Sequence, residues 1–119
     1  MPRRVPTRGE IWFVALQTDP PGKGVRPVIV VSAEPRNRNE RADTVLVVPL
    51  STSVHKLAPT HVLLSSGETG LPADSAARAD SVTTVRKVDL IEPRTGLRRL
   101  SHTRICQLAD AVRIALDCP

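Results

Sequence analysis

The stretch Arg26-Pro27-Val28-Ile29-Val30-Val31-Ser32 joins one cation to a run of apolar, mostly β-branched residues. Such a run predicts a strand that is buried on both of its faces. Pro27 restricts its own φ angle and biases Arg26 towards an extended backbone. Arg26 is therefore expected at the first position of a rigid strand, where the scaffold aims its guanidinium.

Strand patterns recur on both sides of this stretch. We expect strands over residues 9–16, 44–50 and 60–64, and two shorter extended pieces around Arg78 and over residues 83–85. Pro49 should end the strand over 44–50, because proline cannot donate to a β-ladder. The stretch over 65–74 is typical of a turn.

The last element is predicted to be a helix, which Ser101 can cap. Its expected apolar face consists of Ile105, Leu108, Ala109, Val112 and Leu116. Arg104 and Ala111 are expected to face away from the core. Several short strands with one terminal helix favour a mainly β fold with a C-terminal helix, in the manner of a small β-barrel.

The composition of the chain limits the classes of function that the protein can have. The chain has 119 residues, enough for one domain with a single core, and a net charge of +5 that favours a polyanionic partner such as nucleic acid. A basic protein can also owe its charge to solubility alone, so both explanations stay open. Trp12 and Phe13 are the only aromatic residues, which disfavours a platform on which bases stack.

Residues 1–8 are expected to be a flexible basic lead-in, followed by one domain over residues 9–119. No run is apolar enough for a membrane span or a secretory signal, so we expect a cytoplasmic protein without a membrane partner. Cys106 and Cys118 are expected to be reduced thiols. Without clustered histidines they form no zinc site, and neither a metal nor another cofactor is implied.

Three positions at loops and strand ends could form one site. They are Lys23 in the glycine loop over 17–25, Arg26, and the Ser51-Thr52-Ser53 segment. If the strands of Arg26 and of residues 44–50 are antiparallel neighbours, Arg26 and Thr52 meet at one rim. A guanidinium beside hydroxyl groups suits a phosphate, because both donate hydrogen bonds.

A structural explanation of the same residues is equally open. Arg26 could form an ion pair with Glu10 or Asp43, and Thr52 could simply end a turn. In that case neither side chain would have a role in binding or catalysis.

Six segments in a fixed order extend the argument. They are Gly9-Glu10-Ile11-Trp12, Arg26-Pro27-Val28-Ile29-Val30-Val31-Ser32, Pro49-Leu50-Ser51-Thr52-Ser53, Thr60-His61-Val62, Gly70-Leu71 with Asp74-Ser75, and Thr84-Val85-Arg86-Lys87. Each is weak alone, but the ordered set resembles the MazF/PemK toxin family from Gly9 to Leu116. The resemblance implies an SH3-like β-barrel of the CcdB/MazF/PemK type and a homodimer. It also implies the toxin of a type II toxin-antitoxin system.

The resemblance further implies a metal-independent endoribonuclease that cuts single-stranded RNA at short sequences. The products would be 2′,3′-cyclic phosphate and 5′-hydroxyl ends. A cognate MazE-type antitoxin would cover the RNA groove, and the pair would bind DNA.

The family's catalytic arginine falls on Arg26 and its catalytic threonine on Thr52. Arg26 would stabilise charge on the phosphoryl oxygens. A guanidinium stays protonated in proteins and is a poor general base, so that role is left unassigned. The remaining RNA contacts are expected from Lys23, Ser51, Ser53, His55 and Lys56.

One departure from the family pattern concerns the loop before the arginine. Some members carry an acidic residue there, whereas residues 20–25 contain none. We therefore expect a site without that acid, with His55 as a substitute. Base preference does not carry over, because the loop sequence should govern it.

Two other functions remain open. One is a gyrase-poisoning toxin of the CcdB kind, against which the Arg-Pro and Ser-Thr segments speak. The other is a catalytically inactive module that binds RNA or an antitoxin.

Overall fold

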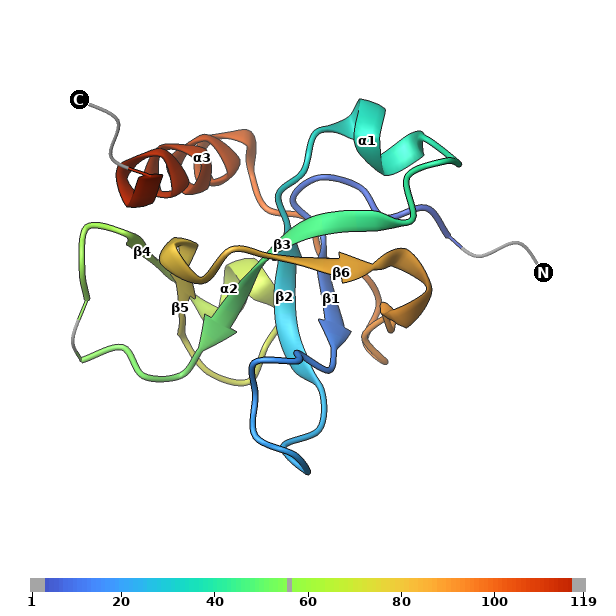
Figure 1. The fold of residues 1–119 in the computed structure, drawn as a ribbon. Coiled ribbons are helices and arrows are strands. Elements are labelled where there is room, and N and C mark those ends of the chain that lie inside the picture. Colours follow the sequence, from blue (N-terminus) through green and yellow to red (C-terminus); the bar gives the residue numbers. More distant parts are fainter. Residues whose placement is uncertain (1–3, 56, 117–119) are drawn as a thin grey trace.

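The computed structural model describes residues 4–55 and 57–116 (Figure 1). Its elements in chain order are β1 (Ile11–Val14), β2 (Arg26–Val30), α1 (Glu34–Arg38), β3 (Thr44–Ser51), β4 (His61–Leu64), α2 (Ser66–Thr69), β5 (Ser75–Arg78), the 3-10 helix η1 (Ala79–Ser81), β6 (Thr83–Arg86), the 3-10 helix η2 (Lys87–Asp89) and α3 (His102–Leu116). The predicted mainly β fold with a C-terminal helix is confirmed.

The predicted lead-in over 1–8 falls partly outside the described residues. Cys118 lies outside them altogether. Within the described part, the backbone N–H of Thr7 donates to Glu10 Oε1 at 2.6 Å. The backbone N–H of Arg8 donates to Glu34 Oε1, also at 2.6 Å. The second of these bonds connects the segment before β1 to α1.

All strand pairs are antiparallel, and β3 pairs with three other strands, β2, β5 and β6. The strand order is β1-β2-β3-β5-β4, and β6 pairs with the first half of β3. The prediction that Pro49 ends the strand is wrong, because β3 continues to Ser51. Pro49 pairs with Val28 of β2, and the next residue, Leu50, already pairs with Ala77 of β5. A missing N–H is tolerated where a strand changes partner.

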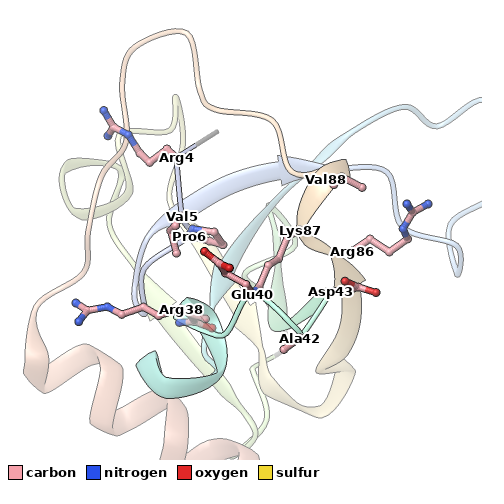
Figure 2. A pocket seen from close by; sticks show the side chains of 11 residues that line it. Arg4, Val5, Pro6, Arg38, Glu40, Ala42, Asp43, Arg86, Lys87 and Val88 are labelled. Carbon is pink, nitrogen blue, oxygen red and sulfur yellow. The ribbon is translucent and has the colours of Figure 1, made fainter. Parts of the chain in front are cut away.

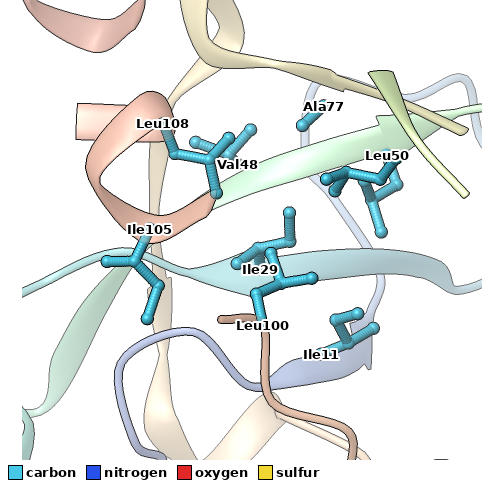
Figure 3. Close-up of a cluster of buried hydrophobic side chains, with 9 residues drawn as sticks. Ile11, Ile29, Val48, Leu50, Ala77, Leu100, Ile105 and Leu108 are labelled. Atoms are coloured by element: carbon cyan, nitrogen blue, oxygen red, sulfur yellow. The ribbon is translucent and has the colours of Figure 1, made fainter. Parts of the chain in front are cut away.

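The core has two parts, and β2 contributes to both. Ile29 packs in one cluster together with Ile11, Val48, Leu50, Leu64, Ala77, Leu100, Ile105 and Leu108 (Figure 3). Val28 and Val30 pack in the other, with Trp12, Val14, Leu16, Val45, Val47, Val85 and Leu90. The predicted burial of this strand on both faces is confirmed.

Helix α3 covers the first cluster through a narrow stripe. Ile105, Leu108 and Ala111 are buried, and the helix contacts η1 and β4. The predicted face is wrong at three positions: Ala109 is exposed, Leu116 is 74% exposed, and Ala111 faces the core. The reason is that the surface of η1 and β4 packs against one row of α3 side chains spaced three residues apart. Apolar periodicity alone does not identify which row that is.

An ion pair joins α3 to α2, in a segment that we had expected to be only a turn. Arg104 Nε lies 2.7 Å from Glu68 Oε1, and Arg104 Nη2 lies 3.3 Å from Oε2. Glu68 also forms a capping box with Ser65. The hydrogen bond from Arg104, followed by that from the Ser65 backbone, lowers the pKa of Glu68 from 4.5 to about 2.

This lowered pKa predicts a pH-dependent contribution to stability. A carboxyl group whose pKa falls on folding stabilises the fold above its unfolded pKa and loses that effect as the pH falls through the folded value. The gap in the free energy of unfolding between wild type and Glu68→Gln should therefore be full at neutral pH and close between 4.5 and about 2. Urea unfolding at stepped pH measures it. In an Arg104→Gln background the pH dependence should shrink, and a gap that is constant with pH would contradict the prediction.

Gly9 stands where α3 approaches the start of β1. Its φ is +91°, and a Cβ there would lie 2.6 Å from Ile105 Cδ1. Gly96 has a similar φ of +93° with open space around it.

We predict that Gly9→Ala costs more stability than Gly96→Ala. Both changes place a side chain in left-handed backbone, at about 1–2 kcal/mol, but only Gly9→Ala adds overpacking, typically 1–3 kcal/mol. Thermal unfolding of both variants measures the difference. Equal losses would show that Ile105 gives way freely.

Candidate functional site

Arg26 is held at the first position of β2 by two partners. Its Nη1 donates to Asp19 Oδ1 at 3.0 Å, and its Nη2 donates to the Leu50 carbonyl oxygen at 3.3 Å. The Arg26 side chain is 21% exposed. A guanidinium has five N–H groups, so these two bonds leave others that can reach an anion.

The start of β2 and the end of β3 form one edge of the sheet, here called the site rim. The antiparallel pairing that was assumed for the two strands is confirmed. The last paired residues at this edge are Val28 and Pro49, and Arg26 Nη2 donates to the carbonyl oxygen of Leu50, the residue before Ser51. Thr52 follows in an exposed bend, and the backbone N–H of Ser53 donates to Ser51 Oγ at 3.1 Å. Arg26 thus reaches the end of β3, where the Ser51-Thr52-Ser53 segment begins.

Two of the other predicted RNA contacts, Lys23 and His55, lie in the loops that precede β2 and follow β3. Lys23 is exposed between Gly22 and Gly24, whose φ angles are +86° and +80°. His55 is exposed, four residues beyond the end of β3. Lys56 lies outside the described residues.

The acidic partner of Arg26 was not foreseen. The alternatives weighed from the sequence were Glu10 and Asp43, but Glu10 accepts from Thr7 and Trp12 instead. Residues 20–25 contain no acid, but Asp19, the residue just before them, contacts the guanidinium. Asp19 immediately precedes the 20–25 stretch, and the loop between β1 and β2 turns it back onto Arg26. A search for acids over the whole hairpin loop would have found it.

A pocket of about 440 Å³ lies at the opposite end of β3 (Figure 2). It is lined by Arg4, Val5, Pro6, Asn37, Arg38, Glu40, Ala42, Asp43, Arg86, Lys87 and Val88. The side chains of Arg4, Arg38 and Arg86 extend away from its centre (Figure 2). Lys87 Nζ points inwards but donates to the carbonyl oxygens of Arg36 and Asn39 at the end of α1. Lys87, the cation that points into the pocket, therefore has a structural role.

Two kinds of feature are absent from residues 4–55 and 57–116. No cluster of three or more His, Cys, Asp or Glu side chains there is arranged to hold a metal ion. No helix in the same ranges has the length and apolarity needed to cross a membrane.

Comparisons with known proteins agree with this fold. The curated relatives include endoribonuclease MazF9 of Mycobacterium tuberculosis, 33% identical over 118 residues that cover 92% of this chain and 95% of that protein. A second is the probable endoribonuclease MazF5 of the same species, 33% identical over 117 residues that cover 96% and 95%.

Among solved structures, an endoribonuclease in complex with its cognate antitoxin from a Mycobacterial species has a TM-score of 0.76. It is 26% identical in sequence, with 96% of this chain and 97% of that one covered. This likeness confirms the predicted MazF/PemK type of small β-barrel. The family model of the PemK-like, MazF-like toxin of type II toxin-antitoxin systems matches residues 7–116. The chain therefore belongs to the PemK-like, MazF-like family of type II toxins.

Proposed function

We propose that this protein is a sequence-specific endoribonuclease that cleaves single-stranded RNA without a metal, with Arg26 and Thr52 as its catalytic residues. The observation that carries the proposal is the hydrogen bond from Arg26 Nη2 to the Leu50 carbonyl, which brings the guanidinium to the strand end that precedes Thr52. Curated relatives that bear the name endoribonuclease support it.

The chemistry follows from what the site rim offers. The RNA 2′-oxygen attacks the adjacent phosphorus in line, the bond to the 5′-oxygen breaks, and a 2′,3′-cyclic phosphate remains. The 2′-hydroxyl loses its proton to a base and the leaving 5′-oxygen gains one. Negative charge accumulates on the nonbridging oxygens, where fixed donors stabilise the transition state most. Arg26 supplies N–H groups there, and Thr52 donates its hydroxyl hydrogen.

The predicted RNA-binding residues would hold the RNA on both sides of the cleaved bond. Lys23 and Lys56 supply positive charge for flanking phosphates, and Ser51, Ser53 and His55 supply hydrogen bonds. The net charge of +5 adds attraction that does not depend on sequence. Trp12 is buried in the core, and Phe13 is the only other aromatic residue of the chain, so bases would be read mainly by polar side chains and by the backbone.

The proposal includes the partners of a toxin. A MazE-type antitoxin would cover the site rim, in line with the relative that is solved with its cognate antitoxin. Val25 and Ile91 are exposed apolar residues in one groove beside the β1–β2 loop, where an antitoxin segment could pack. We further propose a cytoplasmic homodimer built from the domain over residues 9–119, which binds DNA only together with the antitoxin.

We predict that Arg26→Ala lowers the cleavage rate by about 10²–10³-fold, the typical loss for one donor to a developing oxyanion. Thr52→Ala removes one neutral donor and should cost less. The assay incubates a mixed RNA pool with protein in EDTA and maps the ends. Cleavage should persist in EDTA and leave 2′,3′-cyclic phosphates. Arg41→Ala, which removes an exposed arginine near the far end of β3, is the matched control and should cleave normally.

Three outcomes would contradict the proposal. The wild-type protein could fail to cleave, which would leave a binding module. Cleavage could be unaffected by Arg26→Ala, or it could proceed at a 2′-deoxy position, which has no 2′-oxygen to attack.

A further inference from the structure

We propose that Asp19 is a positioning residue for the reaction: its carboxylate sets the orientation in which Arg26 meets the scissile phosphate. This inference rests on the proposed ribonuclease function and assigns a residue that neither the motifs nor the comparisons bring out. It is carried by the contacts of Asp19, by the way its loop is anchored and by one unpaired oxygen atom.

The guanidinium of Arg26 is gripped at two different nitrogens. Asp19 Oδ1 accepts from Nη1 at 3.0 Å, and the Leu50 carbonyl accepts from Nη2 at 3.3 Å. Two bonds to separate nitrogens of a planar group fix the direction of its plane as well as its place. Of the two, the bond to Asp19 is the charge-assisted one and hence the stronger. Without Asp19 the plane could turn about the remaining bond to Leu50.

The carboxylate is itself held firmly. The Asp19 side chain is only 10% exposed. Its backbone N–H donates to the Leu16 carbonyl at 3.1 Å, and the Leu16 side chain is buried in the second core cluster. Pro20 follows directly and disfavours a helical backbone at Asp19. Asp19, which orients Arg26, is thus itself hydrogen-bonded to a residue of the core.

The second carboxylate oxygen of Asp19, Oδ2, is the strongest indication that Asp19 serves to orient Arg26. Asp19 Oδ2 is buried and has no hydrogen-bond partner in the described part of the chain. Leaving a buried polar atom unpaired costs free energy, about 1–3 kcal/mol. The negative charge also offsets part of the attraction between Arg26 and a phosphate. The Asp19–Arg26 pair therefore lowers both the stability of the fold and the affinity for phosphate. What it contributes in return is the fixed orientation of the guanidinium.

This reasoning predicts a specific split in the kinetics. Asp19→Ala frees the guanidinium to turn, and a misplacement of about 1 Å can cost up to 10²-fold in rate. We therefore expect kcat to fall by about 10–10²-fold. The KM for RNA should stay within about threefold or decrease, because a negative charge has been removed beside the phosphate site. Asp19→Asn keeps an oxygen that can accept from Nη1, so its kcat should lie between those of wild type and Asp19→Ala.

The experiment measures kcat and KM at 25 °C with an RNA oligonucleotide that the wild-type protein cuts at one position. Thermal unfolding of every variant is recorded alongside. Asp110→Ala is the matched control, since Asp110 forms a 3.2 Å pair with Arg113 on α3, remote from the site rim. Its kcat should equal that of wild type. If Asp19→Ala does not fold, the lowered kcat of Asp19→Asn carries the test.

The outcomes separate this inference from the proposed function. If wild type cleaves and both Asp19 variants keep a kcat within about twofold of it, the positioning role is overturned, even if their melting temperatures fall. A raised KM with unchanged kcat overturns it as well, because Asp19 would then act in binding. If wild type does not cleave the RNA pool at all, the proposed function fails first and this inference falls with it.

Discussion

Three consecutive side chains of β2 are completely buried and alternate between the two faces of the sheet. Val28 and Val30 enter one hydrophobic cluster and Ile29 enters the other. Full burial of a Val or Ile side chain is worth about 1.5–3 kcal/mol, so any sliding of this strand would expose three such groups or drive them into occupied space. A shift by one residue would exchange the two faces. The register of β2 against β1 and β3 is therefore strongly determined.

The candidate site depends on that register. Arg26 is the first residue of β2, so its position along the sheet is set by the buried residues behind it. At the other end of the strand, Ser32 is held in a buried network: its hydroxyl accepts from the Leu46 N–H at 3.1 Å, and its carbonyl accepts from Asn37 Nδ2 at 2.9 Å. Core packing and this network fix the strand. The pair with Asp19 then fixes the side chain that projects from it.

The change of partner along β3 shapes the site rim. Because β3 leaves β2 at Pro49 and joins β5 at Leu50, its last residues bend out of the plane they shared with β2. Ser51 ends β3 opposite Ala76 of β5, and Thr52 follows in an exposed bend. The Leu50 carbonyl is open to Arg26 because Pro27, which would stand opposite Leu50 if the register continued, has no N–H to donate.

The sequence by itself determined the β2 strand and its burial on both faces, because a run of β-branched residues is a local signal. Only the tertiary structure decided which acid meets Arg26, since a loop's fold-back depends on where its ends are anchored. It also decided that Ala111, and not Ala109, faces the core. A helix buries whichever row of side chains meets the neighbouring surface, and that surface is built by residues far away in the chain.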